Sequence, residues 1–428
     1  MPQVYVIAAE DAYIHGAAVI SATDVNFNIT NDLLNKGTIQ GDTAKISANN
    51  INNVNGIIQG SYVALNAVRN INNTGGNIIS QNSFSLFAGE DISINSKLNT
   101  LYSSQGHTTN IGAIGTVKVT GESGTLNMQA GKDVNINAGI IDNAAGETNI
   151  TAANNINLGT AEISRSQDIV WDSDNKRHDD MTAETGSVIT DKGSINLNAG
   201  NSINARAAAV YGEEYVNLNA QNDINVEAGR QEINLTDDHK HKGSSGGGHS
   251  QTVTIHNEIH ENTAIGSSLY GDNVNINAGK EFNLSGSDIT AENAITVNSG
   301  ADTNIIGAEN AYDKTHTYKK DKKGFLSSEK TNSTVSGGTV DINSGRNVNI
   351  AASNVVADND VNINAEGKID AGTMEDTYES EYIYKVKKSA SFPEAALVLL
   401  LAVKSSVTNM LTRMLKTSAL PLGASMAA

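Results

Sequence analysis

Apolar and polar residues alternate in short segments of this chain, and the segments share a common sequence pattern. The repeat is clearest at residues 133–139, 194–200, 273–279 and 339–345. In each segment an apolar or small residue stands at every second position, and the positions between are mostly asparagine. This alternation predicts a short β-strand with one buried face.

The apolar residues that open these strands recur at alternating steps of eight and thirteen residues. The series consists of Ile195, Ile203, Val216 and Ile224, then Val274, Phe282, Ile295 and Thr303, then Val340, Val348, Val361 and Ile369. The two steps together make a coil of 21 residues. Each coil can bury its inward residues only against its neighbours, which is typical of a solenoid. We therefore expect an all-β fold, a right-handed parallel β-helix with three short strands in each coil.

The regularity of the repeat divides the chain into three parts. Residues 1–164 are expected to form N-terminal coils, and residues 165–392 form further coils that polar insertions interrupt. The insertions are placed at residues 165–186, 236–266, 312–336 and 373–388. Alternation continues inside them, which predicts β-hairpins or strands that protrude from the coils. Insertions on a rigid shaft often carry recognition, and tolerated excursions without a role are the competing interpretation.

The last part of the chain, residues 393–428, loses the Asn-rich repeat. Residues 395–403 are all apolar, and Val407, Met410, Leu411, Met414 and Leu415 follow at helical spacing. The apolar run is shorter than the roughly 20 residues that cross a bilayer. A short helix that caps the coils or touches a membrane surface is one interpretation. A remnant left by truncation of the gene is the other, and we favour it.

Composition and charge exclude several classes of function. Aromatic residues make up 4% of the chain and hydrophobic residues 38%, which suits a thin continuous core better than one large spherical core. The formal charge of −18 argues against nucleic acid as a partner, because binding a phosphate backbone needs clustered Lys and Arg. Residues 1–10 do not resemble a signal peptide, so this fragment is expected to lack one.

The acidic residues of the repeat suggest turns rather than catalysis. Asp91, Asp133, Asp223, Asp302 and Asp360 each stand one residue before a strand-opening position. Asp is common in turns because it tolerates left-handed backbone angles. No pair of carboxylates departs from the repeat in the way that glycoside hydrolysis requires, so we predict no catalytic residue and no cofactor. A carbohydrate-active parallel β-helix enzyme is the alternative reading.

The insertions contain the residues best suited to binding. His256, Glu258 and His260 would share one face of a strand and are weak candidates for a metal site, because exposed histidines are common in polar hairpins. The candidates for contact with a partner are Trp171, His239, His241, Tyr318, Phe325 and Tyr382.

Several runs of the chain together carry a family resemblance. They are residues 35–41, 51–53, 56–60, 63–67, 70–73 and 88–92, and the basic runs at 239–242 and 319–328. In this order they resemble the hemagglutinin repeats of filamentous hemagglutinin-like proteins. They are most similar to the second hemagglutinin-repeat region of contact-dependent growth inhibition effectors. The resemblance covers residues 10–390 in outline.

The resemblance implies a secreted or cell-surface bacterial filament that an outer-membrane partner transporter exports. It also implies adhesion to a receptor or glycan on a target cell and, in the inhibition effectors, carriage of a C-terminal toxin. This sequence lacks the family's N-terminal secretion domain, its Asn-rich pretoxin motif and a recognisable toxin. A fragment of a larger protein or a non-functional gene remnant is therefore expected. An uncovered terminal coil is expected to make copies associate end to end.

Overall fold

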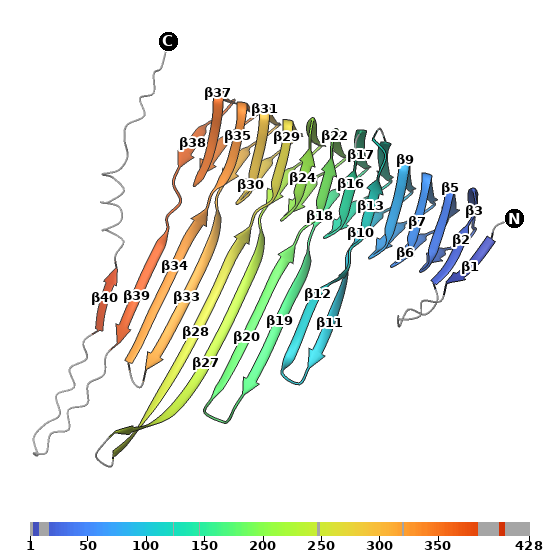
Figure 1. Cartoon of the computed structure of the whole chain (residues 1–428). Coiled ribbons are helices and arrows are strands. Elements are labelled where there is room, and N and C mark those ends of the chain that lie inside the picture. Colours follow the sequence, from blue (N-terminus) through green and yellow to red (C-terminus); the bar gives the residue numbers. More distant parts are fainter. Residues whose placement is uncertain are drawn as a thin grey trace, which may run out of the picture.

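The computed structural model describes residues 3–7, 17–122, 124–144, 146–245, 249–318, 321–383 and 402–406. Every regular element in these residues is a β-strand, and the strands belong to three sheets (Figure 1). The all-β prediction is therefore confirmed. Among the described residues there is no helix long and apolar enough to cross a membrane.

We call the three sheets the long sheet, the short sheet and the hairpin sheet, and the first two form the solenoid. The long sheet consists of β1 (Gln3–Ile7), β2 (Ala17–Ser21), β3 (Asp24–Asn28), β5 (Thr38–Ala48), β7 (Ile57–Ala67), β9 (Asn77–Ala88), β13 (Thr116–Val119), β14 (Gly124–Ala130), β16 (Ile140–Asn143), β17 (Gly146–Ala152), β21 (Val188–Asp191), β22 (Ser194–Ala199), β24 (Ala209–Gly212), β25 (Tyr215–Ala220), β29 (Ser268–Ala278), β31 (Asp288–Ser299), β35 (Ser333–Ser344) and β37 (Ser353–Ala365). The short sheet consists of β4 (Leu33–Asn35), β6 (Ile51–Val54), β8 (Ile71–Thr74), β10 (Ile92–Asn95), β15 (Val134–Asn137), β18 (Ile156–Gly159), β23 (Ile203–Arg206), β26 (Ile224–Glu227), β30 (Phe282–Ser285), β32 (Thr303–Ile306), β36 (Val348–Ala351) and β38 (Ile369–Gly372). The hairpin sheet lies beside the solenoid and consists of β11 (Lys97–Ser103), β12 (Gly106–Ala113), β19 (Ala161–Val170), β20 (Lys176–Thr185), β27 (Gly229–Ser245), β28 (His249–Ile265), β33 (Ala308–Tyr318), β34 (Asp321–Thr331), β39 (Thr377–Ile383) and β40 (Ala402–Ser406).

A typical coil of the solenoid crosses the long sheet twice and the short sheet once, as β24, β25 and β26 do. In other coils the two long-sheet strands merge into one bent strand, as in β31, where the pairing register shifts between Thr290 and Ala294. Strands of successive coils pair in parallel, and the described exception is the antiparallel pair β1–β2 at the N-terminal edge. Partners such as Ile203 and Ile224 lie 18 to 22 residues apart where no hairpin intervenes.

The core is a set of columns that run along the solenoid. Ile195, Val216, Val274, Ile295 and Val340 are aligned by the register of the long sheet, and all are 0% exposed. Each inward side chain is buried by the coils before and after it, because an isolated coil has no interior. Most strand-opening positions found in the sequence are therefore core positions of the fold.

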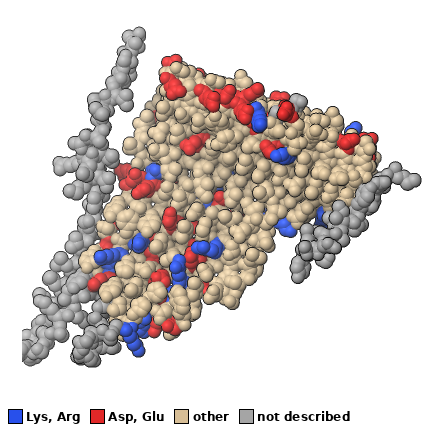
Figure 2. All heavy atoms as spheres, in the orientation of Figure 1, with Lys and Arg blue, Asp and Glu red and all other residues tan. Residues whose placement is uncertain are grey.

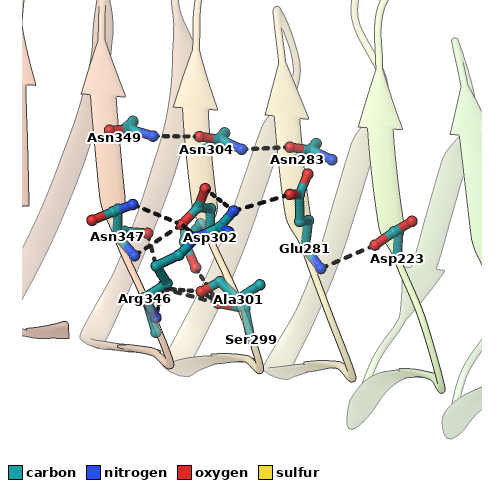
Figure 3. A network of polar contacts seen from close by, with 12 residues as sticks. Asp223, Glu281, Asn283, Ser299, Ala301, Asp302, Asn304, Arg346, Asn347 and Asn349 are labelled. Atoms are coloured by element: carbon teal, nitrogen blue, oxygen red, sulfur yellow. Dashed lines mark hydrogen bonds and ion pairs between the residues drawn. The ribbon is translucent and has the colours of Figure 1, made fainter. Parts of the chain in front are cut away.

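Asparagines form matching columns on the outer side of the same strands. The side-chain amides of Asn225, Asn283, Asn304 and Asn349 each donate to the side-chain oxygen of the asparagine one coil earlier, at 2.7–2.8 Å (Figure 3). A strand spacing of about 4.8 Å allows identical amides to repeat this contact from coil to coil. The ladder therefore pairs polar side chains that lie outside the core.

The aspartates that precede short-sheet strands serve the turns between coils. Asp91, Asp133, Asp223 and Asp302 each accept a hydrogen bond from a backbone N–H of the next coil, at 2.9–3.1 Å. The predicted turn role is confirmed for these four residues. It is wrong for Asp360, which lies inside β37 as the partner of Thr339, because the merged strand has no turn at that point.

Asp302 also takes part in an ion pair between coils (Figure 3). Nε and Nη2 of Arg346 donate to its two carboxylate oxygens at 2.6 and 2.5 Å, and Nδ2 of Asn347 donates at 3.0 Å. Arg346 also lies 3.4 Å from Glu281. The hydrogen bonds from Arg346 are the main cause that lowers the pKa of Asp302 from 3.8 to about 2.

The corner between a short-sheet strand and the next long-sheet strand takes two forms. In most coils without a hairpin the chain turns within one or two residues, and the first of them has a positive φ of 46–61°. These residues are Asn55, Gly75, Ala138, Ala207, Gly286 and Ala352. From β10 onwards every second coil lacks this turn, and the chain continues from β10, β18, β26, β32 and β38 into the hairpin sheet.

This alternation gives the solenoid and the hairpin sheet the same repeat distance. One hairpin contributes two strands, and two coils advance the solenoid by two strand spacings of about 4.8 Å each. The hairpin sheet therefore gains one strand for each coil. It can pair continuously alongside the solenoid without gaps or crowding (Figure 1).

The insertions expected from the sequence correspond to strands of this third sheet. Three of them overlap the hairpins β19–β20, β27–β28 and β33–β34, and each begins inside the first strand of its hairpin. The fourth contains β39. The hairpin β11–β12 is not predicted by the sequence pattern, because it lacks the dense charge that marks the others. The expected tail lies outside the described residues except for Ala402–Ser406, which form β40.

The Asp302 carboxylate should stabilise the solenoid only at pH values above its pKa. Its folded-state pKa of about 2 lies below the ordinary 3.8, so the stability that it contributes is complete above 3.8 and is lost as the pH falls through about 2. We expect Asp302→Asn to lower the melting temperature at neutral pH. The difference from the unaltered chain should shrink as acid is added. Asp360→Asn is the matched control, and a difference that is independent of pH would contradict the assignment.

A glycine should relieve backbone strain at the two-residue corner. Ala207 has a φ of 48°, where a Cβ atom is unfavourable by about 1–2 kcal/mol. Because glycine also has more freedom when unfolded, we expect Ala207→Gly to raise the free energy of unfolding by up to about 1 kcal/mol. Ala209→Gly, in the regular strand β24, should lower it by about 0.5–1 kcal/mol. Urea unfolding of both variants measures the contrast, and a loss of stability in both would refute it.

Candidate functional site

The hairpin sheet is one continuous surface and not a row of separate loops. Neighbouring hairpins pair edge to edge, through β12 with β19, β20 with β27, β28 with β33 and β34 with β39. These pairs are antiparallel, and with the pairs inside each hairpin they join ten described strands (Figure 1). Strands β27 and β28, of 17 residues each, reach far beyond the solenoid.

The two faces of this sheet differ in chemistry. Cross-strand partners share a face, so the register decides which side chains lie together. One face, which we call the apolar face, carries most of the large apolar side chains, which are Ile163, Met181, Ile233, Leu235, Ile255, Ile259, Tyr312, Phe325 and Tyr378. Charged residues stand between them on this face, among them Arg165, Glu261 and Lys314. The opposite, polar face carries His178, Asp180, Thr236, His256, Glu258, His260 and Thr315. The large apolar side chains named for the apolar face are all at least partly exposed, so the described residues leave them accessible to solvent.

Three rings gather at the far end of the apolar face, and we call them the distal ring cluster. Trp171, in the loop between β19 and β20, has its ring centre 5.7 Å from that of His239. His239 stacks on His241 with ring centres 5.9 Å apart. Trp171 is 58% exposed, so the cluster presents an aromatic surface to solvent. The structure thus brings together three of the six residues that the sequence suggested for binding.

A second group of rings lies nearer the last strand of the sheet. Phe325 meets Tyr312 and Tyr378 edge-on, with ring centres 5.7 and 4.8 Å apart. Lys323 places its Nζ atom 5.4 Å from the ring centre of Tyr382, within cation–π distance. A groove on the same face is lined by Leu235, Asn257, Ile259, Lys314, His316, Lys323, Gly324 and Phe325.

Tyr318 is the remaining candidate, and it lies at the end of β33. Its backbone is the register partner of Ile255 on one side and of Asp321 on the other. Its register places it on the apolar face, as it does Phe325 and Tyr382, and its side chain is 41% exposed. The candidates from the sequence therefore lie on, or in contact with, a single face of the sheet.

The polar face holds a histidine between two carboxylates. Nδ1 of His178 lies 2.6 Å from Oδ1 of Asp168, and its Nε2 lies 2.6 Å from Oδ2 of Asp180. The hydrogen bond with Asp168 is the main cause that raises the pKa of His178 above 6.5, and Asp180 adds to it. The charged form of this imidazole therefore cross-links β19 and β20.

The suggested metal ligands share the polar face and are hydrogen-bonded to neighbouring side chains, including one another. Nδ1 of His256 lies 2.6 Å from Asp238, while Nδ1 of His260 lies 2.7 Å from Asn234 and its Nε2 lies 3.1 Å from Glu258. Within the described part of the chain, no group of three or more His, Asp and Glu side chains is placed to hold a metal ion. The contacts with Asp238 and Asn234 link β28 to β27, and the contact with Glu258 lies within β28.

A charged junction joins the hairpin sheet to the solenoid. Glu184, at the base of β20, accepts hydrogen bonds from Nε and Nη2 of Arg206 in β23 at 2.8 and 2.6 Å. It also accepts one from the backbone N–H of Arg230 in β27 at 2.6 Å. Burial alone would raise the pKa of Glu184, but the hydrogen bonds from Arg206 and Arg230 outweigh it and lower the pKa. One carboxylate thus ties two hairpins to one coil.

Buried serines fix the points where hairpins return to the coils. Ser187, Ser267 and Ser333 follow β20, β28 and β34, and each is at most 1% exposed. Their hydroxyl groups donate to backbone carbonyl oxygens of short-sheet strands at 2.5, 2.8 and 2.6 Å. These serines and Glu184 were not among the residues expected from the sequence. The available signal was a serine at the start of the coil that follows each of these insertions.

An acidic groove on the long sheet is the place to examine the enzyme hypothesis. Its lining includes Asp142, Asp191, Glu213, Glu214, Asp272 and Glu292. Burial raises the pKa of Asp191, but Thr148, Gly193 and Asn143 donate to its oxygens at 2.5, 2.8 and 3.1 Å, and the residue is 4% exposed. A general acid must come within hydrogen-bond reach of its substrate. Asp191 therefore serves the turn between β21 and β22.

Charge is distributed unevenly over the surface. Acidic side chains gather along the edge of the solenoid that lies away from the hairpin sheet, whereas acidic and basic side chains are mixed over the hairpins (Figure 2). On the hairpins, Lys240 binds Asp174 at 2.8 Å and Lys330 binds Glu309 at 2.9 Å. The pair of Lys240 is exposed and contributes little stability, whereas the Lys330 side chain is 10% exposed. Together such pairs give the hairpin sheet a polar, mixed-charge surface.

Three stretches of the chain match the hemagglutinin repeat family, at residues 170–257, 248–325 and 319–388. Together they extend from residue 170 to residue 388, which is just over half of the chain. The chain belongs to the hemagglutinin repeat family. Each match begins in or beside one hairpin of the third sheet and ends in or near the next one. The unit of the hemagglutinin repeat is therefore two coils with the hairpin strands that flank them.

Among curated proteins, the chain is similar to the tRNA nuclease CdiA-2 of Burkholderia pseudomallei (strain 1026b). The two are 25% identical over 408 residues, which are 91% of this chain and 13% of the relative. The chain thus spans about an eighth of the length of that protein. No solved structure matches the chain significantly. The predicted resemblance to filamentous hemagglutinin-like and growth-inhibition proteins is confirmed.

The contact between His178 and Asp168 should depend on pH. Because the folded-state pKa of His178 lies above 6.5, the stability from this contact is complete below pH 6.5 and is lost as the pH rises through the folded-state pKa. We expect the NMR titration midpoint of the His178 ring to fall in Asp168→Asn. Asp174→Asn, a change in the neighbouring loop, is the matched control and should leave it in place. An unchanged midpoint in Asp168→Asn would rule out this cause.

Proposed function

We propose that this chain is a shaft segment of a secreted, filamentous adhesin of the contact-dependent growth inhibition type, and that the hairpin sheet is its binding surface. The observation that carries the proposal is the continuous hairpin sheet, whose open apolar face presents the distal ring cluster. Membership of the hemagglutinin repeat family and the similarity to CdiA-2 support it. An extended surface on a rigid shaft is the arrangement that repeat proteins commonly use for binding.

The solenoid supplies stiffness and reach in this proposal. We expect its coils, of about 21 residues, to be right-handed, because crossovers between parallel strands are right-handed in about 98% of cases. The proposed division is a first set of coils over residues 1–164, which includes the hairpin β11–β12, a set that the polar insertions interrupt over residues 165–392, and a tail over residues 393–428. The N-terminal coils of β4, β6 and β8 carry no hairpin and act as plain shaft.

The partners follow from the family and from the surface. The full-length protein is expected to leave the cell through an outer-membrane transporter partner and to remain secreted or at the cell surface. A receptor or glycan of the target cell is the expected ligand of the hairpin sheet. Exposed rings such as Trp171 bury a large area on contact and frequently dominate the binding energy of an interface. Similarity to a nuclease effector supports a further role in delivering a toxin that another part of the protein carries.

Removal of the three hairpins β19–β20, β27–β28 and β33–β34 should abolish binding to target cells and leave the shaft folded. The tight corner of Gly286 and Ser287 supplies the replacement, because it closes a coil of the same solenoid without an insertion. We would substitute Gly-Ser for residues 160–187, 228–267 and 307–333. Saturable binding of the purified chain to intact bacterial and host cells should be lost, with β-sheet circular dichroism retained. Equal binding by both chains would reject the hairpin sheet as the binding surface.

The aromatic ring of Trp171 alone should contribute measurably to the affinity for target cells. Trp171→Ala is expected to weaken cell binding about tenfold, because truncation of an exposed aromatic anchor typically costs more than 1 kcal/mol. Tyr215→Ala removes a ring of similar exposure from the long sheet and should leave binding unchanged. Titration of labelled protein on intact cells measures both. If the two substitutions had the same effect, the distal ring cluster would not be the contact.

A further inference from the structure

The solenoid has an exposed end at its last coil. Val361 and Ile369 occupy inward core positions of this coil, yet they are 42% and 50% exposed. Their register partners one coil earlier, Val340 and Val348, are 0% exposed. Among the described strands β37 pairs only with β35 and β38 only with β36, so both also have an unpaired backbone edge. Apolar core residues and strand edges are thus presented on one surface, which we call the terminal face.

The chain after this coil follows the same course as the earlier hairpins. It leaves β38 at the hairpin corner and forms β39, which pairs with β34. Strand β40 then pairs antiparallel with β39, from Ala402 opposite Ile383 to Ser406 opposite Glu379. An antiparallel second strand returns the chain towards the corner. After β20, β28 and β34 the same return leads directly into the next coil.

Residues 407–428, which follow β40, have the composition to cover the terminal face. Their apolar residues include Val407, Met410, Leu411, Met414, Leu415, Leu420 and Leu422.

Charge also favours this pairing. The last coil carries Asp358, Asp360, Glu366 and Asp370 against a single Lys368, over residues 353–372. Residues 407–428 carry Arg413 and Lys416 and no acidic residue. A basic segment is attracted to an acidic end surface. A second copy of the same terminal face would be repelled by it.

We propose that residues 407–428 bind the terminal face and cap the solenoid, and that the cap prevents copies from associating through this end. The binding buries the inward side chains of β37 and β38, and repeat proteins need such a terminal cap to stay soluble. Exposed strand edges otherwise pair with other chains. The proposal concerns the last coil only and does not depend on the proposed role of the hairpin sheet.

Hydrogen exchange on the full chain tests the cap. Compared with the full chain, a variant that ends at Ser406 should exchange the amides of β37 and β38 at least about tenfold faster, while β24 and β25 are unchanged. The double variant Leu411→Ser, Leu415→Ser should do the same. Thr412→Ser, Thr417→Ser is the matched control and should exchange like the full chain. Unchanged exchange at β37 and β38 in both the truncated and the Leu variant would overturn the proposal.

Sedimentation over a range of concentrations separates the cap from a second copy. The full chain should keep its mass on concentration, whereas the variant that ends at Ser406 should form larger species. Ile369→Lys in the truncated chain should reverse that growth. A full chain that dimerises, and whose β37 and β38 lose protection on dilution, would show that a second copy occupies the terminal face and would refute the cap.

Discussion

The spacing of about 4.8 Å between hydrogen-bonded strands is the constraint on which the other features of this protein depend. It sets the rise of each coil, because neighbouring coils pair strand by strand. It also sets the distance between neighbouring strands of the hairpin sheet. Two coils and one hairpin therefore have equal rise, and hairpins on alternate coils meet edge to edge. A hairpin on every coil would crowd its neighbours, and one on every third coil would leave a gap.

The corners of the solenoid determine which coils carry a hairpin. A left-handed residue such as Ala207 or Gly286 closes one coil at once, and the next coil extends into a hairpin. Glu184 binds Arg206 of the intervening coil together with the backbone of the following hairpin, so the two kinds of corner are also linked by charge. The matches to the hemagglutinin repeat run from one hairpin to the next, which fits a two-coil unit.

The same arrangement separates a buried core from an accessible surface. The solenoid buries its apolar columns except at its last described coil, whereas the hairpin sheet is a single layer whose apolar face remains accessible. A single layer cannot bury both faces by itself, so its stability comes from strand pairing and from its attachment at the corners. That attachment explains how large rings such as Trp171 can be held in place far from the core. Exposed aromatic groups held on a rigid base are well suited to contact with another surface.

The sequence alone determined the solenoid and the alternation within its strands. The steps of eight and thirteen residues placed Ile203, Ile224 and Phe282 in the core, because a strand with one buried face has an apolar residue at every second position of its sequence. The same period placed His256, Glu258 and His260 on one face. The hairpin β11–β12 was not predicted, since its sequence lacks the dense charge of the other hairpins. Only the tertiary structure decided that β12 meets β19, that Glu184 meets Arg206 and that Trp171 meets His239. Those contacts depend on how many coils lie between two hairpins and on how far each hairpin extends, and a local pattern of residues records neither.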